Sequence, residues 1–190
     1  DRVFVADAIF LGTARISNGP VPQFDTKLND PAVNAPRFDV ARANALLDEA
    51  GYPRGAGGTR FSLKLLPAPW FEQTRQFGDY LRQALRAVGI DAQIVNNDPA
   101  GHTKAVYTDH AFDLAIGSPV YRNDPAISTT ILYQSGVPAG VPFANQWGYA
   151  SPAMDDIIAR GATTLDPERR IAAYKEFQHI ANNELPIIHV

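Results

Sequence analysis

Apolar residues recur three and four positions apart in several segments of the chain, which is the spacing of an amphipathic helix. Residues 39–51 also carry the residue types that mark the two ends of a helix. They begin with Asp39, a residue type that caps helix N-termini, and end with Gly51, a residue type that readily adopts the left-handed conformation found just after a helix. Asp-Pro pairs open three other segments in a similar manner. The pattern predicts helices in residues 1–12, 39–51, 70–89, 98–110, 124–136, 151–165 and 166–184.

Shorter segments favour β-strands. Residues 60–66 and 90–95 alternate apolar and polar positions, whereas residues 111–117 are mostly apolar, as in a strand buried on both faces. Short connections join the first two strands to the helix between them, so these elements form a βαβ unit with parallel strands and a right-handed crossover. Residues 185–190 are a further β-like run. The element pattern predicts an α/β fold.

Residues 13–38 differ from the rest of the chain because they contain four prolines and no sustained period. They are expected to form an irregular connection across a surface. The first twelve residues start within a helical pattern, and the last six stop within a β-like one. We therefore expect the 190 residues to be one lobe cut from a longer protein. A fold of this length buries roughly 70% of the surface of its unfolded chain.

Composition narrows the possible functions. The formal net charge of −3 gives no electrostatic footprint for nucleic acid, so a nucleic-acid partner is not expected. No apolar run approaches the roughly 20 residues of a membrane-spanning helix. The absence of cysteine excludes disulfides and thiolate metal sites. No motif for a cofactor or a metal occurs, and we expect neither.

Catalytic motifs are also missing. The four histidines lack HxH and HExxH spacing, and the chain has no Gly-x-Ser-x-Gly elbow or Gly-rich phosphate loop. An enzyme remains an alternative only through isolated residues: a hydrolase could use His102 or His110 with Asp109 and Asp113. A test is whether these groups lie within hydrogen-bond reach of one another in a pocket.

Candidate binding residues lie in loops. The segment "GSPVYRNDPA", residues 117–126, follows a predicted strand and places Tyr121, Arg122 and Asn123 in a row before Asp124, which is expected to cap a helix. Trp70 also follows a strand end. Ligands of open α/β sheets collect outside the carboxyl ends of parallel strands, so Trp70 and this loop are expected at one sheet edge. The alternative is that these side chains are solvated or cover the core.

Several segments follow one another in a recognisable order: "DRVFVADAIFLGTA", "GPVP", "FDVARANALLDEAGYP", "GDYLRQALRAVGIDAQIV", "FDLAIGSPVYRNDPA" and the run from "NQWGYASPAMDD" to "LPIIHV". Taken together, they resemble the extracellular solute-binding proteins of family 5, the peptide- and nickel-type receptors of ABC importers. The resemblance covers nearly the whole chain. It implies a type II periplasmic-binding-protein-like lobe with a mixed sheet, a parallel βαβ unit and flanking helices.

The resemblance implies a function as well. Family members have two lobes that close around a small-molecule solute and deliver it to an ABC permease in the membrane. Residues 1–190 are then a single C-terminal ligand-binding lobe, with termini near the crossings to an N-terminal lobe of the same full-length protein. The expected location is periplasmic, or extracellular and membrane-associated. A solute-sensing receptor domain is an alternative within the same resemblance.

The resemblance also points to the solute. Peptide-binding members usually carry an aspartate in the segment that corresponds to residues 117–126, where it pairs with the free amino group of the peptide. Here that position falls on Tyr121 or Arg122, so an ordinary free-amine peptide is not expected. Arg122 would suit a carboxylate on the solute. The resemblance places a second group near the cleft, namely Asn145, Gln146 and Trp147.

Overall fold

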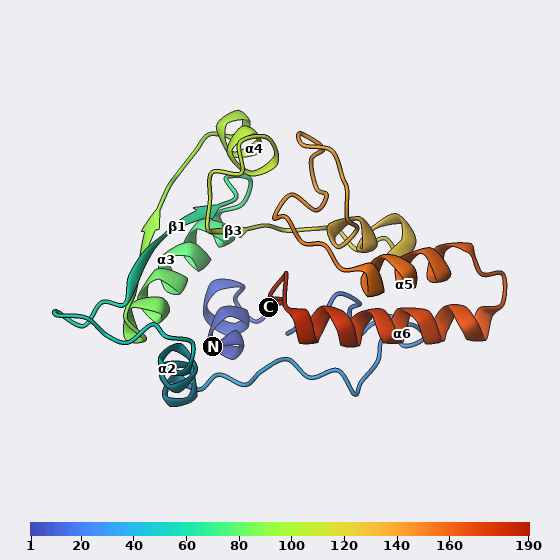
Figure 1. The fold of residues 1–190 in the computed structure, drawn as a ribbon, viewed down its shortest axis with the longest axis horizontal. Coiled ribbons are helices and arrows are strands. Elements are labelled where there is room, and N and C mark those ends of the chain that lie inside the picture. Colours follow the sequence, from blue (N-terminus) through green and yellow to red (C-terminus); the bar gives the residue numbers. More distant parts are fainter. The chain divides into compact units, whose positions relative to one another are not determined.

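A computed structural model describes all residues, 1–190, and the chain divides into two compact units (Figure 1). Unit 1 comprises residues 1–14 and 37–118. Unit 2 comprises residues 15–36 and 119–190. The chain therefore passes from one unit to the other within the segments that the sequence predicts to be loops. The expectation of a single lobe stays a prediction.

Unit 1 is built on a three-stranded sheet. Its strands are β1 (Phe61–Pro67), β2 (Ile90–Ile94) and β3 (Leu114–Ile116). The strand order is β2-β1-β3, and both pairs are parallel, with Phe61 opposite Ile90 and Leu65 opposite Leu114. Helix α3 (Glu72–Ala87) connects β1 to β2. The α/β class and the parallel βαβ unit are confirmed, and this sheet contains no antiparallel strand.

The third strand is shorter and less buried than the apolar run predicts. It lies at the edge of the sheet, where Ile116 is buried but Ala115 is exposed. The expected burial on both faces is therefore wrong. The core of unit 1 forms around Leu65, Ala92 and Ile116, with apolar residues of α3 packed against them.

The other helices of unit 1 agree with the predicted segments. They are α1 (Arg2–Phe4), which continues as the π-helical turn η1 (Val5–Ile9), α2 (Val40–Glu49) and α4 (Pro99–Tyr107). Asp39 caps α2 by accepting a hydrogen bond from the Arg42 amide at 2.8 Å, although α2 buries none of its residues. Asp98 caps α4 by accepting a hydrogen bond from the Gly101 amide at 2.6 Å.

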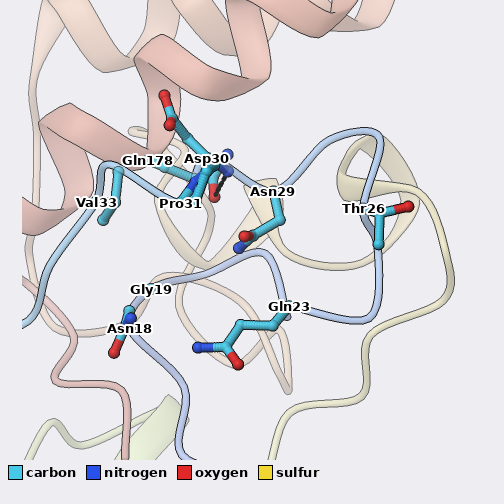
Figure 2. Close-up of a pocket in the computed structure, with 9 residues that line it drawn as sticks. All are labelled: Asn18, Gly19, Gln23, Thr26, Asn29, Asp30, Pro31, Val33 and Gln178. Carbon is cyan, nitrogen blue, oxygen red and sulfur yellow. Dashed lines mark hydrogen bonds between the residues drawn. The ribbon is translucent and has the colours of Figure 1, made fainter.

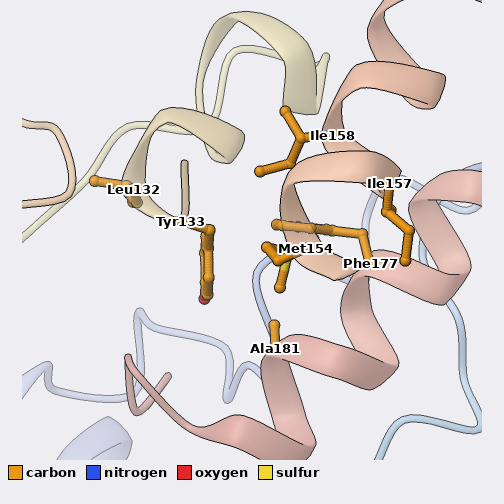
Figure 3. Close-up of a cluster of buried hydrophobic side chains, with 7 residues drawn as sticks. All are labelled: Leu132, Tyr133, Met154, Ile157, Ile158, Phe177 and Ala181. Carbon is orange, nitrogen blue, oxygen red and sulfur yellow. The ribbon is translucent and has the colours of Figure 1, made fainter. Parts of the chain in front are cut away.

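Unit 2 has its core between two helices, α5 (Pro152–Thr163) and α6 (Pro167–Glu184). Both were predicted, with Ser151 and Asp166 as their N-caps. The cluster in Figure 3 joins these two helices to residues 132–133 of a separate turn through side chains that are almost fully buried. Its members are Leu132, Tyr133, Met154, Ile157, Ile158, Phe177 and Ala181.

The predicted helix in residues 124–136 is wrong, since only two 3₁₀ turns form, η2 (Pro125–Ile127) and η3 (Thr130–Leu132). The Ser128 hydroxyl bonds the carbonyl that the Ser128 amide would use in a helix. Ser128 Oγ donates to the Asp124 carbonyl at 2.6 Å, whereas the Ser128 amide donates to the Pro125 carbonyl at 3.2 Å, which is the 3₁₀ pattern. Such bonds compete with helical ones.

The chain's last residues do not form a strand. Leu185 ends α6 in the left-handed conformation, with φ of 47°. The segment is then held by a side chain instead of a ladder, because His189 Nε2 lies 2.7 Å from the hydroxyl of the buried Tyr133.

The segment 13–38 contains no helix or strand, but part of it is tied firmly to α6. Gln178, whose side chain is buried, donates from Nε2 to the Leu28 carbonyl at 2.8 Å. Its Oε1 accepts from the Asp30 amide at 3.2 Å. Residues 15–36 of this irregular segment are therefore an ordered part of unit 2.

His102 is buried in unit 1, with 3% of its surface exposed. The Trp70 ring meets it edge-on, with ring centroids 5.3 Å apart. The Nδ1 atom of His102 is buried without a hydrogen-bond partner. Burial lowers the pKa of this imidazole because the charged form loses its hydration.

Helix α3 lies close to the sheet at Gly78. A Cβ atom at this position would lie 2.6 Å from Cγ of Pro67, on a rigid ring in β1. We expect Gly78→Ala to lower the free energy of unfolding by up to about 2 kcal/mol. Overpacking costs about 1–3 kcal/mol, and the close contact with a rigid ring places this site toward the upper end. The gain from placing alanine in a helix, about 1 kcal/mol, offsets only part of this cost. Urea denaturation measures the change.

Gln83→Ala is the matched control, because Gln83 lies on the same helix and is exposed. This variant is expected to stay within about 0.5 kcal/mol of the parent chain. A Gly78→Ala variant that is more stable than the parent would contradict the close approach of α3 to β1.

The burial of His102 predicts a pH dependence. The folded state favours neutral His102, whereas the unfolded chain protonates this residue near its ordinary pKa of about 6.5. The free energy of unfolding should therefore fall as the pH decreases below about 6.5, and level off below the folded-state pKa. His102→Phe is expected to reduce this fall. Urea denaturation at several pH values tests it, and an equal pH dependence in both chains would refute it.

Candidate functional site

Tyr121 is anchored inside unit 2. Its hydroxyl donates to Oδ2 of Asp25 at 2.5 Å, although the two residues lie 96 positions apart. The ring of Phe24 meets the Tyr121 ring edge-on, with centroids 5.8 Å apart. Burial and the neighbouring Asp25 carboxylate raise the pKa of Tyr121 far above its ordinary value, so the phenol keeps its proton. As arranged, the hydroxyl is used within the protein.

Asp124 is a second anchor of the same loop. Its Oδ1 accepts from the Ala126 amide at 3.0 Å, which is the expected capping bond, here to the turn η2. The carboxylate also accepts hydrogen bonds from Nη2 of Arg170, at 2.8 Å to Oδ1 and 2.9 Å to Oδ2. Arg170 in turn lies over the Tyr174 ring, 5.0 Å from its centroid. These contacts join the loop to α6.

Arg122 and Asn123 lie between the two anchors, and both are exposed. Neither side chain makes a hydrogen bond or an ion pair within the chain. Asn123 adopts the left-handed conformation, with φ of 60°. Asparagine tolerates this region better than most residues. The loop therefore presents a free guanidinium from a backbone that is held on both sides.

Asn145 and Gln146 are buried, with 7% and 4% of their surfaces exposed. Asn145 Nδ2 donates to the carbonyls of Gln134 at 2.9 Å and Tyr149 at 2.7 Å. Gln146 Nε2 donates to the Pro138 carbonyl at 3.0 Å. Their amide groups therefore hold the loop that carries them. A ligand-binding role for the two residues stays a prediction.

Trp147 is half-buried and packs against the core cluster of α5 and α6. Its indole Nε1 is buried without a hydrogen-bond partner, and so is Oδ1 of Asn145. Native proteins satisfy most buried polar atoms, so this donor and this acceptor are unusual. Trp147 is a core-edge residue with one unused polar group, and its role toward a solute stays a prediction.

Trp70 belongs to unit 1, whereas the other six candidates belong to unit 2. It follows β1, and Gly117 follows β3, the parallel neighbour of β1. Both therefore lie at the carboxyl-end edge of the sheet, as the sequence predicts for Trp70 and the start of the loop. The rest of the loop, from Pro119, is part of unit 2.

The residues of the enzyme alternative are used separately. Asp109 pairs with Nζ of Lys104. Asp113 Oδ2 accepts from the Lys64 amide at 2.7 Å. Neither of these two bonds is to a histidine. The structure also contains no group of three or more His, Cys, Asp or Glu side chains arranged to hold a metal. None of its helices combines the length and apolar character needed to cross a membrane.

Two residues that hold the loop 117–126 in place could not be predicted from the sequence. Asp25 lies in a segment without periodicity, and Arg170 looks like one of several charges on a solvated helix face. Only the folded chain brings them to Tyr121 and Asp124. Their spacing in the sequence carries no signal of either contact.

Comparison with known proteins gives consistent matches. Protein XP55 of Streptomyces lividans is 30% identical over 191 aligned positions, which cover 94% of this chain and 33% of that protein. Di/tripeptide-binding protein 1 of Pseudomonas aeruginosa is 24% identical over 185 positions, covering 96% of this chain and 33% of that protein. The chain spans about a third of the length of the curated relatives it matches.

Solved structures share the fold. HbpA2 from Haemophilus parasuis superposes with a TM-score of 0.85 at 22% identity, covering 100% of this chain and 36% of that one. The binding protein AgaA from A.tumefacien R10, in complex with agropinic acid, superposes with a TM-score of 0.82 at 22% identity, covering 100% of this chain and 37% of that one. The type II periplasmic-binding-protein-like fold class is confirmed.

The family assignment follows from a third comparison. The model for bacterial extracellular solute-binding proteins, family 5 Middle, matches residues 1–140, which is most of the chain. This match agrees with the resemblance seen in the sequence motifs and with the shared fold. The chain therefore belongs to family 5 of the bacterial extracellular solute-binding proteins.

Proposed function

We propose that this chain is a ligand-binding lobe of the substrate-binding component of an ABC importer. The family match over residues 1–140 carries this proposal. The partners are a small-molecule solute, an N-terminal lobe of the same full-length protein and an ABC permease in the membrane. The protein acts by closing two lobes around the solute, without catalysis. It works in the periplasm, or outside the cell in association with the membrane.

One observation, the partners of Asp109 and Asp113, favours a binding function over hydrolysis. The carboxylates of Asp109 and Asp113 are paired with Lys104 and with the Lys64 amide, instead of with His102 or His110. A general base needs an orienting partner and a reacting group within hydrogen-bond reach. The bonds that Asp109 and Asp113 make to Lys104 and to the Lys64 amide therefore give no support to a hydrolase.

The solute is proposed to carry an acidic group that meets Arg122. Tyr121 and Asp124 are held by Asp25 and Arg170, which leaves Arg122 as the charged side chain that the loop presents. Guanidinium binds carboxylate through two parallel charge-assisted hydrogen bonds. Asn123 adds an exposed amide beside it. Asn145, Gln146, Trp147 and Trp70 are proposed as further wall residues of the cleft.

The absence of an aspartate at Tyr121 or Arg122 argues against an ordinary free-amine peptide. Matched probes separate the two possibilities: the dipeptide Ala-Ala, its N-acetylated form, and agropinic acid, which occupies the related AgaA. Acetylation removes the amine and keeps the carboxylate. We expect the full-length protein to bind N-acetyl-Ala-Ala or agropinic acid at least as well as Ala-Ala, and calorimetry measures this. A strict requirement for the free amine would overturn this proposal about the solute.

Arg122→Ala in the full-length protein is expected to weaken binding of the acidic probe about 10–100-fold. A hydrogen bond to a charged group contributes about 1.5–3 kcal/mol, and each 1.4 kcal/mol is about tenfold in affinity. Arg122→Lys should recover only part of the loss, because an ammonium group cannot form the two-point contact. Calorimetric titration of each variant measures the effect.

Arg75→Ala is the control, since Arg75 is an exposed arginine of α3 without an ion pair. Its affinity for the probe should equal that of the parent protein. Unchanged affinity in Arg122→Ala, with a probe that the parent binds, would remove Arg122 from the site and leave the family assignment intact.

The 190-residue chain alone is expected to bind the same probe far more weakly than the full-length protein. A solute held at about 1 μM corresponds to about −8.2 kcal/mol, and losing half of that leaves about 1 mM. Circular dichroism confirms that the chain is folded, and calorimetry then compares the two affinities. Equal affinity in the folded chain would contradict closure of two lobes.

A further inference from the structure

We propose that unit 2 carries a second binding site, for a neutral polyhydroxylated small molecule such as a sugar or a polyol. The site is a pocket formed by residues 18–33 and by Gln178 of α6 (Figure 2). Nothing in this proposal depends on transport or on the solute proposed for the cleft. It rests on the shape, the charge and the unused hydrogen-bonding groups of the pocket.

The pocket has the size of a small-molecule site. Its volume is about 380 Å³, and sites for small ligands usually measure about 300–1,000 Å³. All of its lining belongs to unit 2, so one compact unit forms it without a contribution from unit 1. The concavity lies where the irregular segment turns back over α6.

The wall of the pocket is preformed. Gln178 is 1% exposed and bonds the Leu28 carbonyl, the Asp30 amide and the Tyr174 carbonyl. Asn29 Nδ2 donates to the Val21 carbonyl at 2.8 Å. These bonds fix the backbone on both sides of the cavity before any ligand arrives. A preformed wall lowers the ordering cost of binding.

Polar groups in this wall remain available. The side chains of Asn18, Gln23 and Thr26 line the pocket but make no hydrogen bond within the chain. Figure 2 shows the Gln23 side chain extending in the direction of Asn18. Each primary amide offers both a donor and an acceptor, as does each hydroxyl of a sugar or polyol.

The lining contains a single charged group. Asp30 is the only ionisable residue in the lining, and its carboxylate turns toward α6 in Figure 2. There it accepts from the Ala32 amide at 2.9 Å and lies 3.1 Å from Nε2 of His179. The backbone hydrogen bond from Ala32 contributes most to the lowered pKa of Asp30, so the carboxyl stays ionised. This charge would repel an anion. A cation is not favoured either, because both carboxylate oxygens of Asp30 already have a partner, the Ala32 amide and His179.

Small and apolar groups complete the lining. Gly19, Pro31 and Val33 supply surfaces without hydrogen-bonding side chains. A carbohydrate has the matching character, because its C–H groups pack on apolar surface while its hydroxyls bond the amides. An apolar ligand would displace water from these amides without replacing its hydrogen bonds, which lowers affinity.

A charge-matched series of probes tests the site in the full-length protein. D-Glucose and sorbitol are the neutral probes, and gluconate and N-methyl-D-glucamine are the anionic and cationic counterparts of sorbitol. Saturation-transfer NMR and calorimetric titration measure each affinity. We expect saturable binding of D-glucose or sorbitol, and at least about fivefold weaker binding of both charged probes. No saturable binding of either neutral probe, or tighter binding of a charged one, would overturn the proposal.

Two variants locate the binding in this pocket. Gln23→Ala and Asn18→Ala remove side chains that bond nothing within the chain, so thermal unfolding should be unchanged. Each is expected to weaken binding of the neutral probe about fivefold, the loss of about one hydrogen bond. Gln76→Ala, an exposed glutamine on α3, is the matched control and should bind as the parent does. Parental affinity in both pocket variants would refute the site.

Discussion

The arrangement of unit 2 depends on one buried amide, that of Gln178. Gln178 belongs to α6 and is only 1% exposed, and its side chain forms hydrogen bonds with backbone groups of Leu28 and Asp30. A buried amide without partners would cost free energy, so these bonds strongly favour one path for the segment over the helix. The path then places Asp25, whose Oδ1 accepts from the Leu28 amide at 3.0 Å. An element without secondary structure is in this way given a defined position.

The candidate loop inherits its geometry from that path. Asp25 uses its other carboxylate oxygen to accept the hydroxyl of Tyr121. Asp124, three residues after Tyr121, accepts a hydrogen bond from Arg170 of α6. The guanidinium of Arg122 is exposed between two fixed points, so its backbone is positioned although its side chain is free. Preorganisation of this kind is what a charged recognition residue needs, since less entropy is lost when a ligand binds.

Local signals explain which parts of the fold could be predicted. Helices α2, α5 and α6 have both periodic apolar residues and a capping side chain, and the βαβ unit follows from short connections between well-marked elements. The segment 124–136 has the same apolar spacing, but the Ser128 hydroxyl bonds the Asp124 carbonyl that a helix would use, and only 3₁₀ turns form. Spacing alone does not reveal this competition.

The candidate site was harder to predict, because its order comes from contacts between distant residues. The sequence pointed to Tyr121 and Gln146 as polar groups in loops, yet the folded chain uses Tyr121 to hold Asp25 and Gln146 to hold the Pro138 carbonyl. Arg122, next to the anchored tyrosine, keeps its polar group unused. A polar residue in a loop is thus ambiguous until its partners are known.

Residues 13–38 show how much an irregular segment can do. In the sequence they are only a proline-rich connection. In the structure, Asp25 anchors the loop that presents Arg122, while Asn29 and Asp30, a few positions along, form the wall of the polar pocket. Both sites draw their rigidity from the same bonds to Gln178. Since one buried amide supports both, a change in the path of this segment would alter the two sites together, whereas changes on α2 or α3 would reach neither through these bonds.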